Sequence, residues 1–135
     1  MKLITIIESI IKDDLTKFIP VKPNRFVYHS SNPIFRNKID KNGLIPKRGD
    51  QWLTNTPIKG KVIFATNSND KSDWFDSTYD DDFYRIDTSK ISNKWYRDPN
   101  FKDTDKYKFY HIITFEPIPR DAIELIYQGT GEDVL

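Results

Sequence analysis

The sequence predicts an α+β domain whose strands outnumber its helices. Short apolar and β-branched stretches bounded by Pro, Gly and Asn recur along the chain, and each has the length of a strand. The predicted helices are short and no strand–helix–strand rhythm is sustained, which favours α+β over a doubly wound parallel sheet. At 135 residues the chain fits one domain with a sizeable core.

The N-terminal segment predicts an amphipathic helix from about residue 2 to residue 18. Its apolar residues recur at helical spacing and Pro20 ends it; they are Leu3, Ile6, Ile7, Ile10, Ile11, Leu15 and Phe18. We therefore divide the chain into this helix, residues 1–19, and a domain, residues 20–135. Because so wide an apolar stripe rarely stays in water, we expect residues 2–18 to be covered, and we favour packing on another chain over packing on the domain itself.

The next elements are a strand and a short helix. Residues 25–29 read as a buried strand, Asn32 suits a helix cap, and Pro33 suits the first turn. Gly43 is a C-terminal stop for that helix. Its apolar side is expected to consist of Ile34, Phe35 and Ile39.

The remaining chain alternates loops with strands. Residues 45–60 carry Pro and Gly without a period and predict a loop, and the polar residues 92–106 predict an exposed loop. A short helix is expected around Trp74 and Phe75. Further strands are predicted at residues 62–66, 82–86, 107–115 and 123–127.

The composition of the chain excludes several classes of functional site. The formal net charge is +1, which gives no overall attraction to nucleic acid, and the acidic run of Asp80, Asp81 and Asp82 is expected to be a solvated surface. No cysteine is present, which excludes disulfides, thiolate zinc sites and a cysteine nucleophile and fits a cytoplasmic location. No apolar run is long enough to span a membrane, and we expect neither a membrane partner nor a secretory signal.

Four blocks of residues, in order, carry a resemblance to a known family. They are Phe26-Val-Tyr-His29-Ser-Ser, Ile39-Asp-Lys-Asn-Gly-Leu-Ile-Pro46, Gly60-Lys-Val-Ile-Phe-Ala-Thr66 with Asn69-Asp-Lys-Ser-Asp-Trp74, and Phe115-Glu-Pro-Ile-Pro-Arg-Asp-Ala-Ile123. Together they resemble the polymerase-type ADP-ribosyltransferases, in which a first strand ends in His-Gly-Ser or His-Gly-Thr. The resemblance covers residues 25–127 and implies a pair of split antiparallel sheets with short helices around a cleft.

The resemblance also implies a substrate and roles for individual residues. NAD would be the substrate, with His29 on the adenosine ribose, Phe64 stacked on nicotinamide and Ser31 orienting His29. Glu116 would be the catalytic carboxylate beside the nicotinamide ribose, where an oxocarbenium-like positive charge develops. A flat aromatic face suits the cationic nicotinamide ring.

The sequence departs from the family pattern at two positions. Ser30 stands where Gly is usual, in the segment that approaches the nicotinamide amide, and Phe64 stands where Tyr is usual. Glu124 is a rival to Glu116 for the catalytic role, and His111 is interpreted as structural. No metal is implied, because two histidines without cysteine give no ligand set of convincing spacing.

Two functions therefore stay open. The first is NAD-dependent transfer of ADP-ribose to a protein or nucleic-acid acceptor. The second is a catalytically inert transferase-like fold that serves as a structural or cargo protein of a phage virion. The N-terminal segment Met1-Lys-Leu-Ile-Thr-Ile-Ile-Glu8-Ser9 resembles the leaders of tailed-phage virion proteins, which implies packaging, virion attachment or self-association through residues 2–18.

Overall fold

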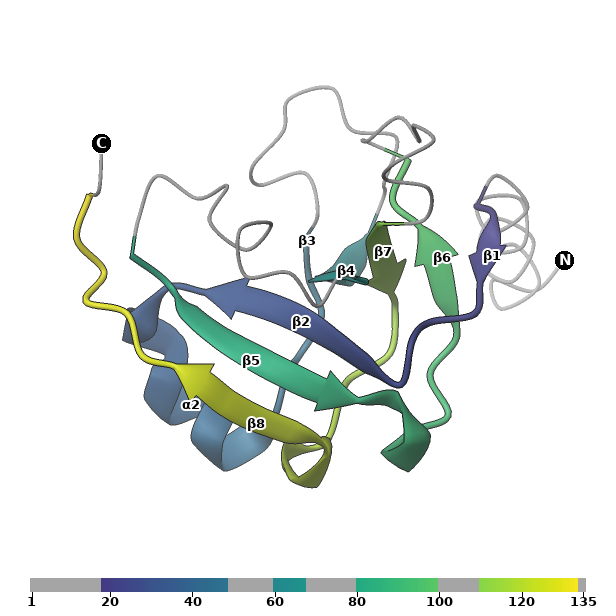
Figure 1. Cartoon of the computed structure of the whole chain (residues 1–135). Helices are drawn as coiled ribbons and strands as arrows, with labels where there is room; N and C mark the ends of the chain where they lie inside the picture. Colours follow the sequence, from purple (N-terminus) through teal and green to yellow (C-terminus); the bar gives the residue numbers. More distant parts are fainter. Residues whose placement is uncertain (1–17, 49–59, 68–79, 100–109, 134–135) are drawn as a thin grey trace, which may run out of the picture.

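The computed structural model describes residues 18–48, 60–67, 80–99 and 110–133, and within them it shows an α+β domain built on an antiparallel sheet (Figure 1). Seven strands follow one another across the sheet in the order β1-β6-β7-β4-β2-β5-β8, and β3 pairs with β4. Every pairing is antiparallel. The strands are β1 (Pro20–Val21), β2 (Phe26–Ser31), β3 (Lys47–Arg48), β4 (Lys61–Thr66), β5 (Asp82–Asp87), β6 (Trp95–Arg97), β7 (His111–Thr114) and β8 (Ile123–Tyr127).

The short helix after β2 begins and ends where the sequence predicts. The Asn32 side chain accepts a hydrogen bond from the Ile34 amide, and Pro33 opens a 3-10 turn, η1 (Pro33–Phe35), that runs into α2 (Arg36–Asn42). Ile39 of this helix is buried. Ile34 was expected to face the core and is 77% exposed, because it lies in the 3-10 turn before the regular helix begins.

Gly43 ends α2 in a conformation that only glycine adopts readily. Its φ of 74° and ψ of −163° lie in a region that a Cβ makes costly. A Cβ built there would also lie 2.2 Å from the Ile118 carbonyl oxygen. This close approach lets Leu44 and Ile118 exchange two backbone hydrogen bonds of 2.9 Å, so the second and fourth sequence blocks are in direct contact.

The core lies on both faces of the sheet because successive strand residues point to opposite sides. In β4, Ile63 and Ala65 pack in the larger cluster, which includes Ile39 of α2. Val62 belongs to a second cluster with Phe18 and Ile113. Figure 1 shows α2 on one side of the strands β2, β5 and β8.

Two predicted loops contain strands. Residues 92–106 were expected to form an exposed loop, yet Trp95–Arg97 forms β6 between β1 and β7, and Trp95 is buried in the larger cluster. Residues 45–60 were predicted as a loop, but Lys47–Arg48 pairs with β4. Residues 92–106 are mostly polar and residues 45–60 have no period, so the strand structure in both segments comes from partners outside them.

The acidic run was wrongly expected to be a solvated surface. Asp82 is fully buried and forms an ion pair with Arg36 of α2, with donor–acceptor distances of 2.7 and 2.8 Å. The Asp82 carboxylate also accepts a hydrogen bond from the Gly129 amide, and the Gly129 carbonyl accepts a hydrogen bond from Arg36. Asp80 accepts the Tyr127 hydroxyl at 2.7 Å. These carboxylates therefore connect the start of β5 to α2 and to the segment after β8.

The described part of the N-terminal segment contacts the domain. Phe18 is buried against Tyr96 and Phe115, with ring centroids 6.2 and 5.4 Å away, and the Ile19 carbonyl accepts from Arg97. Pro20–Val21, directly after the predicted helix, pairs with β6. The predicted helix lies outside the described residues apart from Phe18, which is in a bend, and so does the predicted helix around Trp74 and Phe75.

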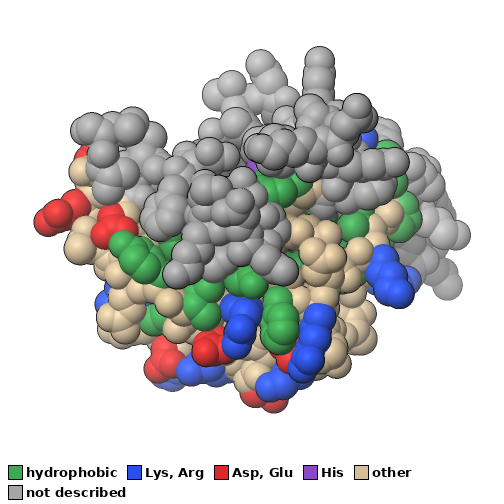
Figure 2. All heavy atoms as spheres, in the orientation of Figure 1, with side chains coloured by type: hydrophobic (Ala, Val, Ile, Leu, Met, Phe, Trp, Pro, Cys, Tyr) green, Lys and Arg blue, Asp and Glu red, His purple; other side chains and the backbone are tan. Residues whose placement is uncertain are grey.

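The described helices include none with the length and apolar character needed to cross a membrane. On the face shown in Figure 2, acidic and basic side chains of the described residues alternate along the lower edge. Ion pairs such as Arg85–Glu124 and Arg120–Asp40 fit this interspersed pattern.

Candidate functional site

His29 lies where two neighbouring strands separate. Strands β2 and β5 share six residue pairs, whereas β2 and β4 share only the pair of Tyr28 with Thr66. If that ladder continued, Ser30 would stand opposite Phe64. Instead the His29 ring occupies this position, and its Nδ1 lies 2.6 Å from the Phe64 carbonyl oxygen.

This contact fixes the tautomer of His29. A carbonyl oxygen only accepts hydrogen bonds, so Nδ1 carries the proton and donates it to Phe64. Burial lowers the pKa of His29 below its ordinary 6.5, the Phe64 hydrogen bond opposes this effect, and the positive charge of Lys47 lowers the pKa further. At neutral pH the ring is therefore neutral, and Nε2 holds a lone pair that can accept a hydrogen bond.

The other residues of the first-strand block lie beside His29 on β2. Ser30 is exposed and Ser31 is partly buried, opposite Phe83 and Asp82 of β5. The Phe64 ring is partly buried and packs on the cluster of Phe18, Val62 and Ile113. The structure thus brings His29 to the main chain of Phe64, while the Phe64 ring contacts a hydrophobic cluster.

Glu116 lies in the bend after β7. Phe64 pairs with Ile113 across the β4–β7 ladder, and Glu116 follows Ile113 by three residues. The side chain of Glu116 is exposed. Its carbonyl accepts a 3.0 Å hydrogen bond from Asn93, whose amide also lies 3.2 Å from the Thr114 hydroxyl. Asn93 therefore fixes the main chain that carries Glu116.

Glu124, the rival carboxylate, lies on β8 opposite Arg85 of β5. The two side chains form an exposed ion pair, with an Nη2–Oε2 distance of 2.5 Å. Its carboxylate is thus already bound by a cation on the neighbouring strand, at the edge of the sheet away from β4 and β7.

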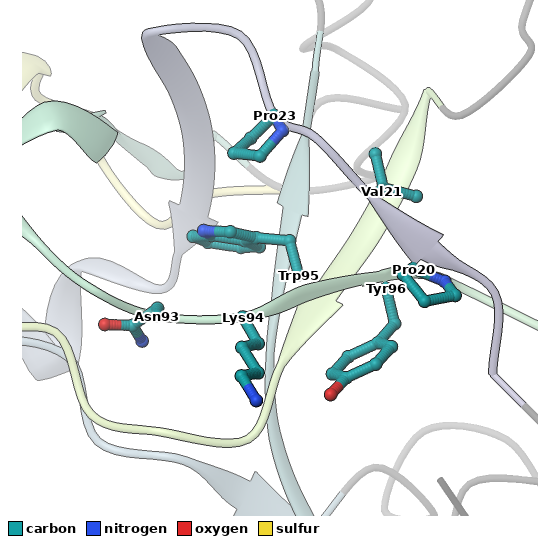
Figure 3. A pocket seen from close by; sticks show the side chains of 7 residues that line it. All are labelled: Pro20, Val21, Pro23, Asn93, Lys94, Trp95 and Tyr96. Atoms are coloured by element: carbon teal, nitrogen blue, oxygen red, sulfur yellow. The ribbon is translucent and has the colours of Figure 1, made fainter. Parts of the chain in front are cut away.

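Two cavities among the described residues lie away from His29, Phe64 and Glu116. The larger, of about 380 Å³, is lined by residues of β1 and β6; Figure 3 shows the Trp95 ring below Pro23, while the Tyr96 side chain points away from this ring. Trp95 Nε1 is buried there and has no hydrogen-bond partner among the described residues. The smaller cavity, of about 260 Å³, lies between α2 and strands β5 and β8.

Sequence reasoning missed Lys47, a residue close enough to act on His29. Its Nζ lies 3.4 Å from the centroid of the Phe35 ring, a cation–π contact, and its charge contributes to lowering the pKa of His29. A single lysine after Pro46 gives no pattern by which sequence reasoning could have identified it. Only the pairing of β3 with β4 places it near the first-strand histidine.

Among the described residues, no group of three His, Asp or Glu side chains is arranged to hold a metal ion. No family model, no curated protein and no solved structure matches this chain.

Proposed function

We propose that this protein transfers ADP-ribose from NAD to a macromolecular acceptor, with the site around His29 and Glu116. The observation that carries the proposal is the His29 ring, held by the Phe64 carbonyl where β2 and β4 separate. A neutral imidazole with Nδ1 committed to a carbonyl offers Nε2 as an acceptor. That acceptor suits a ribose hydroxyl, which is the role that the resemblance to ADP-ribosyltransferases assigns to His29.

The proposed chemistry requires one carboxylate. The bond between nicotinamide and C1′ of its ribose breaks, nicotinamide leaves as a neutral molecule, and the ribose becomes oxocarbenium-like. A nucleophile of the acceptor then bonds to C1′ and loses its proton. The Glu116 carboxylate stabilises the positive charge, and its exposed side chain on a fixed main chain supports this assignment over the ion-paired Glu124.

The remaining block residues support substrate positioning in this proposal. Ser31 follows His29 by two residues on β2, so its hydroxyl is on the same face of the strand, whereas the Ser30 side chain points to the opposite face. Phe64 supplies the carbonyl that orients His29, in addition to the stacking role implied by the resemblance. Lys47 keeps the neutral form of His29 favoured, because its positive charge opposes a second one nearby.

The test uses the full chain with NAD labelled in the ADP-ribose part and a lysate that provides acceptors. We expect label on a macromolecule and free nicotinamide, both reduced about 100-fold or more in Glu116→Gln. Glu124→Gln is the matched control and is expected to behave as the parent. If neither product forms with the parent and Glu116→Gln is indistinguishable from it, catalysis is excluded. Copurification with phage particles would then support the inert virion component.

A further inference from the structure

Lys47 carries a positive charge that no carboxylate of the described residues neutralises. Its ammonium lies 3.4 Å from the centroid of the Phe35 ring, and it forms neither an ion pair nor a hydrogen bond with any residue that the structure describes. Burial, and then the positive charge of Lys38 on α2, lower the pKa of Lys47 below its ordinary 10.5. Two lysines that act on one another without an acidic partner create a positive potential, which attracts an anion.

The carboxylates of α2 and of the start of β5 are bound by arginines instead. Asp40 accepts hydrogen bonds from Arg120 at 3.0 and 3.1 Å, and Asp82 accepts hydrogen bonds from Arg36 at 2.7 and 2.8 Å. Both arginines are thereby neutralised. The Lys47 ammonium, in contrast, keeps its three N–H donors for a partner that the described residues do not supply.

Strand pairing places Lys47 beside His29. Lys47 of β3 lies opposite Val62 of β4, and Phe64, whose carbonyl holds the His29 ring, follows two residues later on the same strand. Two residues of a strand span about 7 Å. Besides burial, the charge of Lys47 lowers the pKa of His29. The lysine without an acidic partner is therefore close to the ring that carries the proposed function.

The other polar groups of this region lie on the same side of the sheet. On β2, His29 and Ser31 follow Val27 by two and four residues, so all three point to one face. Val27 belongs to the larger hydrophobic cluster, and the Phe35 ring, which contacts the Lys47 ammonium, packs against that cluster. His29, Ser31 and the ammonium of Lys47 therefore share one face.

NAD contains one group that suits such a cation. A hydroxyl of the adenosine ribose can donate to Nε2 of His29, and the diphosphate is joined to C5′ of that same ribose. The diphosphate carries two negative charges, whereas the nicotinamide ring is positive and would be repelled. Lysine binds phosphate groups as a point charge, without the fixed geometry that an arginine requires.

We propose that Lys47 binds the diphosphate group of NAD, beside the adenosine ribose at His29. This inference rests on the proposed NAD site and adds a residue that none of the four motif blocks contains. It also implies a preference for NAD over NADP. A phosphate on the 2′ oxygen of the adenosine ribose would remove a hydroxyl donor and place acceptor oxygens against the lone pair of His29 Nε2.

The test is isothermal titration calorimetry of ADP-ribose into the full-length protein. ADP-ribose carries the adenosine ribose and the diphosphate but no nicotinamide, so no reaction interferes. Lys47→Gln removes the charge of an exposed side chain and should weaken binding about tenfold, as expected for one hydrogen bond to a charged group. Lys47→Arg keeps the charge and should lose less affinity. Because salt screens exposed charges, affinity should fall more steeply with ionic strength for the parent than for Lys47→Gln.

Lys90→Gln is the matched control. It removes one positive charge from η4 (Thr88–Lys90), where the Lys90 ammonium donates to the Asp121 carbonyl, and its affinity for ADP-ribose should equal that of the parent. The inference is overturned if the parent does not bind ADP-ribose, if Lys47→Gln binds it as tightly as the parent, or if Lys90→Gln loses as much affinity. It is also overturned if ADP-ribose 2′-phosphate binds the parent more tightly than ADP-ribose, since Lys47 would then bind the 2′-phosphate.

Failure of this inference and failure of the proposed function give different results. Label transfer that Glu116→Gln abolishes, together with an unchanged affinity of Lys47→Gln for ADP-ribose, would refute the role of Lys47 alone. ADP-ribose binding that requires Lys47, without label transfer or free nicotinamide from the parent, would refute the transferase and leave the diphosphate contact standing.

Discussion

Replacing Asp82 with asparagine tests whether the buried ion pair holds the start of β5 against α2. Asp82 is fully buried, and its carboxylate accepts three hydrogen bonds, two from Arg36 at 2.7 and 2.8 Å and one from the Gly129 amide at 2.9 Å. An asparagine has the same shape but no charge, and its amide nitrogen can only donate. At least one of the three donors therefore loses its acceptor.

The size of the effect follows from this geometry. Removing one partner of a buried ion pair costs about 3 to 5 kcal/mol, because the remaining charge is left uncompensated. The Arg36 side chain is 33% exposed, so water partly solvates the guanidinium that Asp82→Asn leaves behind. We therefore expect a loss near the lower limit, about 3 kcal/mol in the free energy of unfolding, a large share of the ~5–15 kcal/mol typical of a domain.

The measurement is urea denaturation followed by circular dichroism, with the denaturant slope fitted for each variant. Glu124→Gln is the control, because it also removes one carboxylate from an arginine, but in a pair whose side chains are 38% and 61% exposed. Exposed pairs contribute less than about 1 kcal/mol. A loss for Asp82→Asn below about 1 kcal/mol, or no larger than that for Glu124→Gln, would show that the buried pair does not stabilise the fold as argued.

Three further predictions concern local geometry, packing and pH. Gly43→Ala should lower the free energy of unfolding in urea by more than about 2 kcal/mol, because backbone strain and the Ile118 carbonyl both oppose a Cβ. Gly60 also has a positive φ but has open space around it, so Gly60→Ala should lose less stability. Equal losses of stability for the two variants would contradict this reasoning. Phe18→Ala should cost about 3 kcal/mol by thermal unfolding, whereas Ile34→Ala should be nearly neutral; a neutral Phe18→Ala would place Phe18 outside the core. Because the folded pKa of His29 is lowered, the unfolded chain binds more protons, and stability should fall as pH drops from 6.5 toward that lower pKa. His29→Gln should flatten this slope in urea midpoints measured across that range, and an unchanged slope would contradict the assignment.

The elements predicted correctly are those whose signals are local. Asn32 and Gly43 act on backbone groups a few residues away, so the start and end of the short helix follow from the sequence. Strands β4, β5 and β8 were predicted within one residue of their observed bounds, because β-branched and aromatic runs signal a partly buried strand. The resulting α+β class with a mainly antiparallel sheet is confirmed.

The elements that were missed depend on partners distant in sequence. Trp95–Arg97 looks like part of a polar loop, and it is a strand because β1 and β7 lie on either side of it. Asp82 looks solvated within an acidic run, and it is buried because Arg36, 46 positions earlier, neutralises it. Neither partner leaves a periodic signal in the sequence near the residue it affects.

For the candidate site, the sequence supplied residue types and their order. It identified His29, Ser30, Ser31, Phe64 and Glu116 through motif blocks, and their catalytic and NAD-binding roles stay predictions. The hydrogen bond between His29 and the Phe64 carbonyl was beyond sequence reasoning, since a backbone carbonyl is present at every position. Lys47 also became visible only in the folded chain.

By itself, then, the sequence determined the fold class, the helix that follows the first strand, and the set of residues in the proposed NAD site. These depend on periodicity, capping and motif spacing, which act over a few residues. The tertiary structure alone decided that β2 and β4 separate beside His29 and that Asp82 is buried against Arg36. Each of these depends on the electrostatic and packing free energy between segments roughly 35 or more positions apart, which local patterns do not encode.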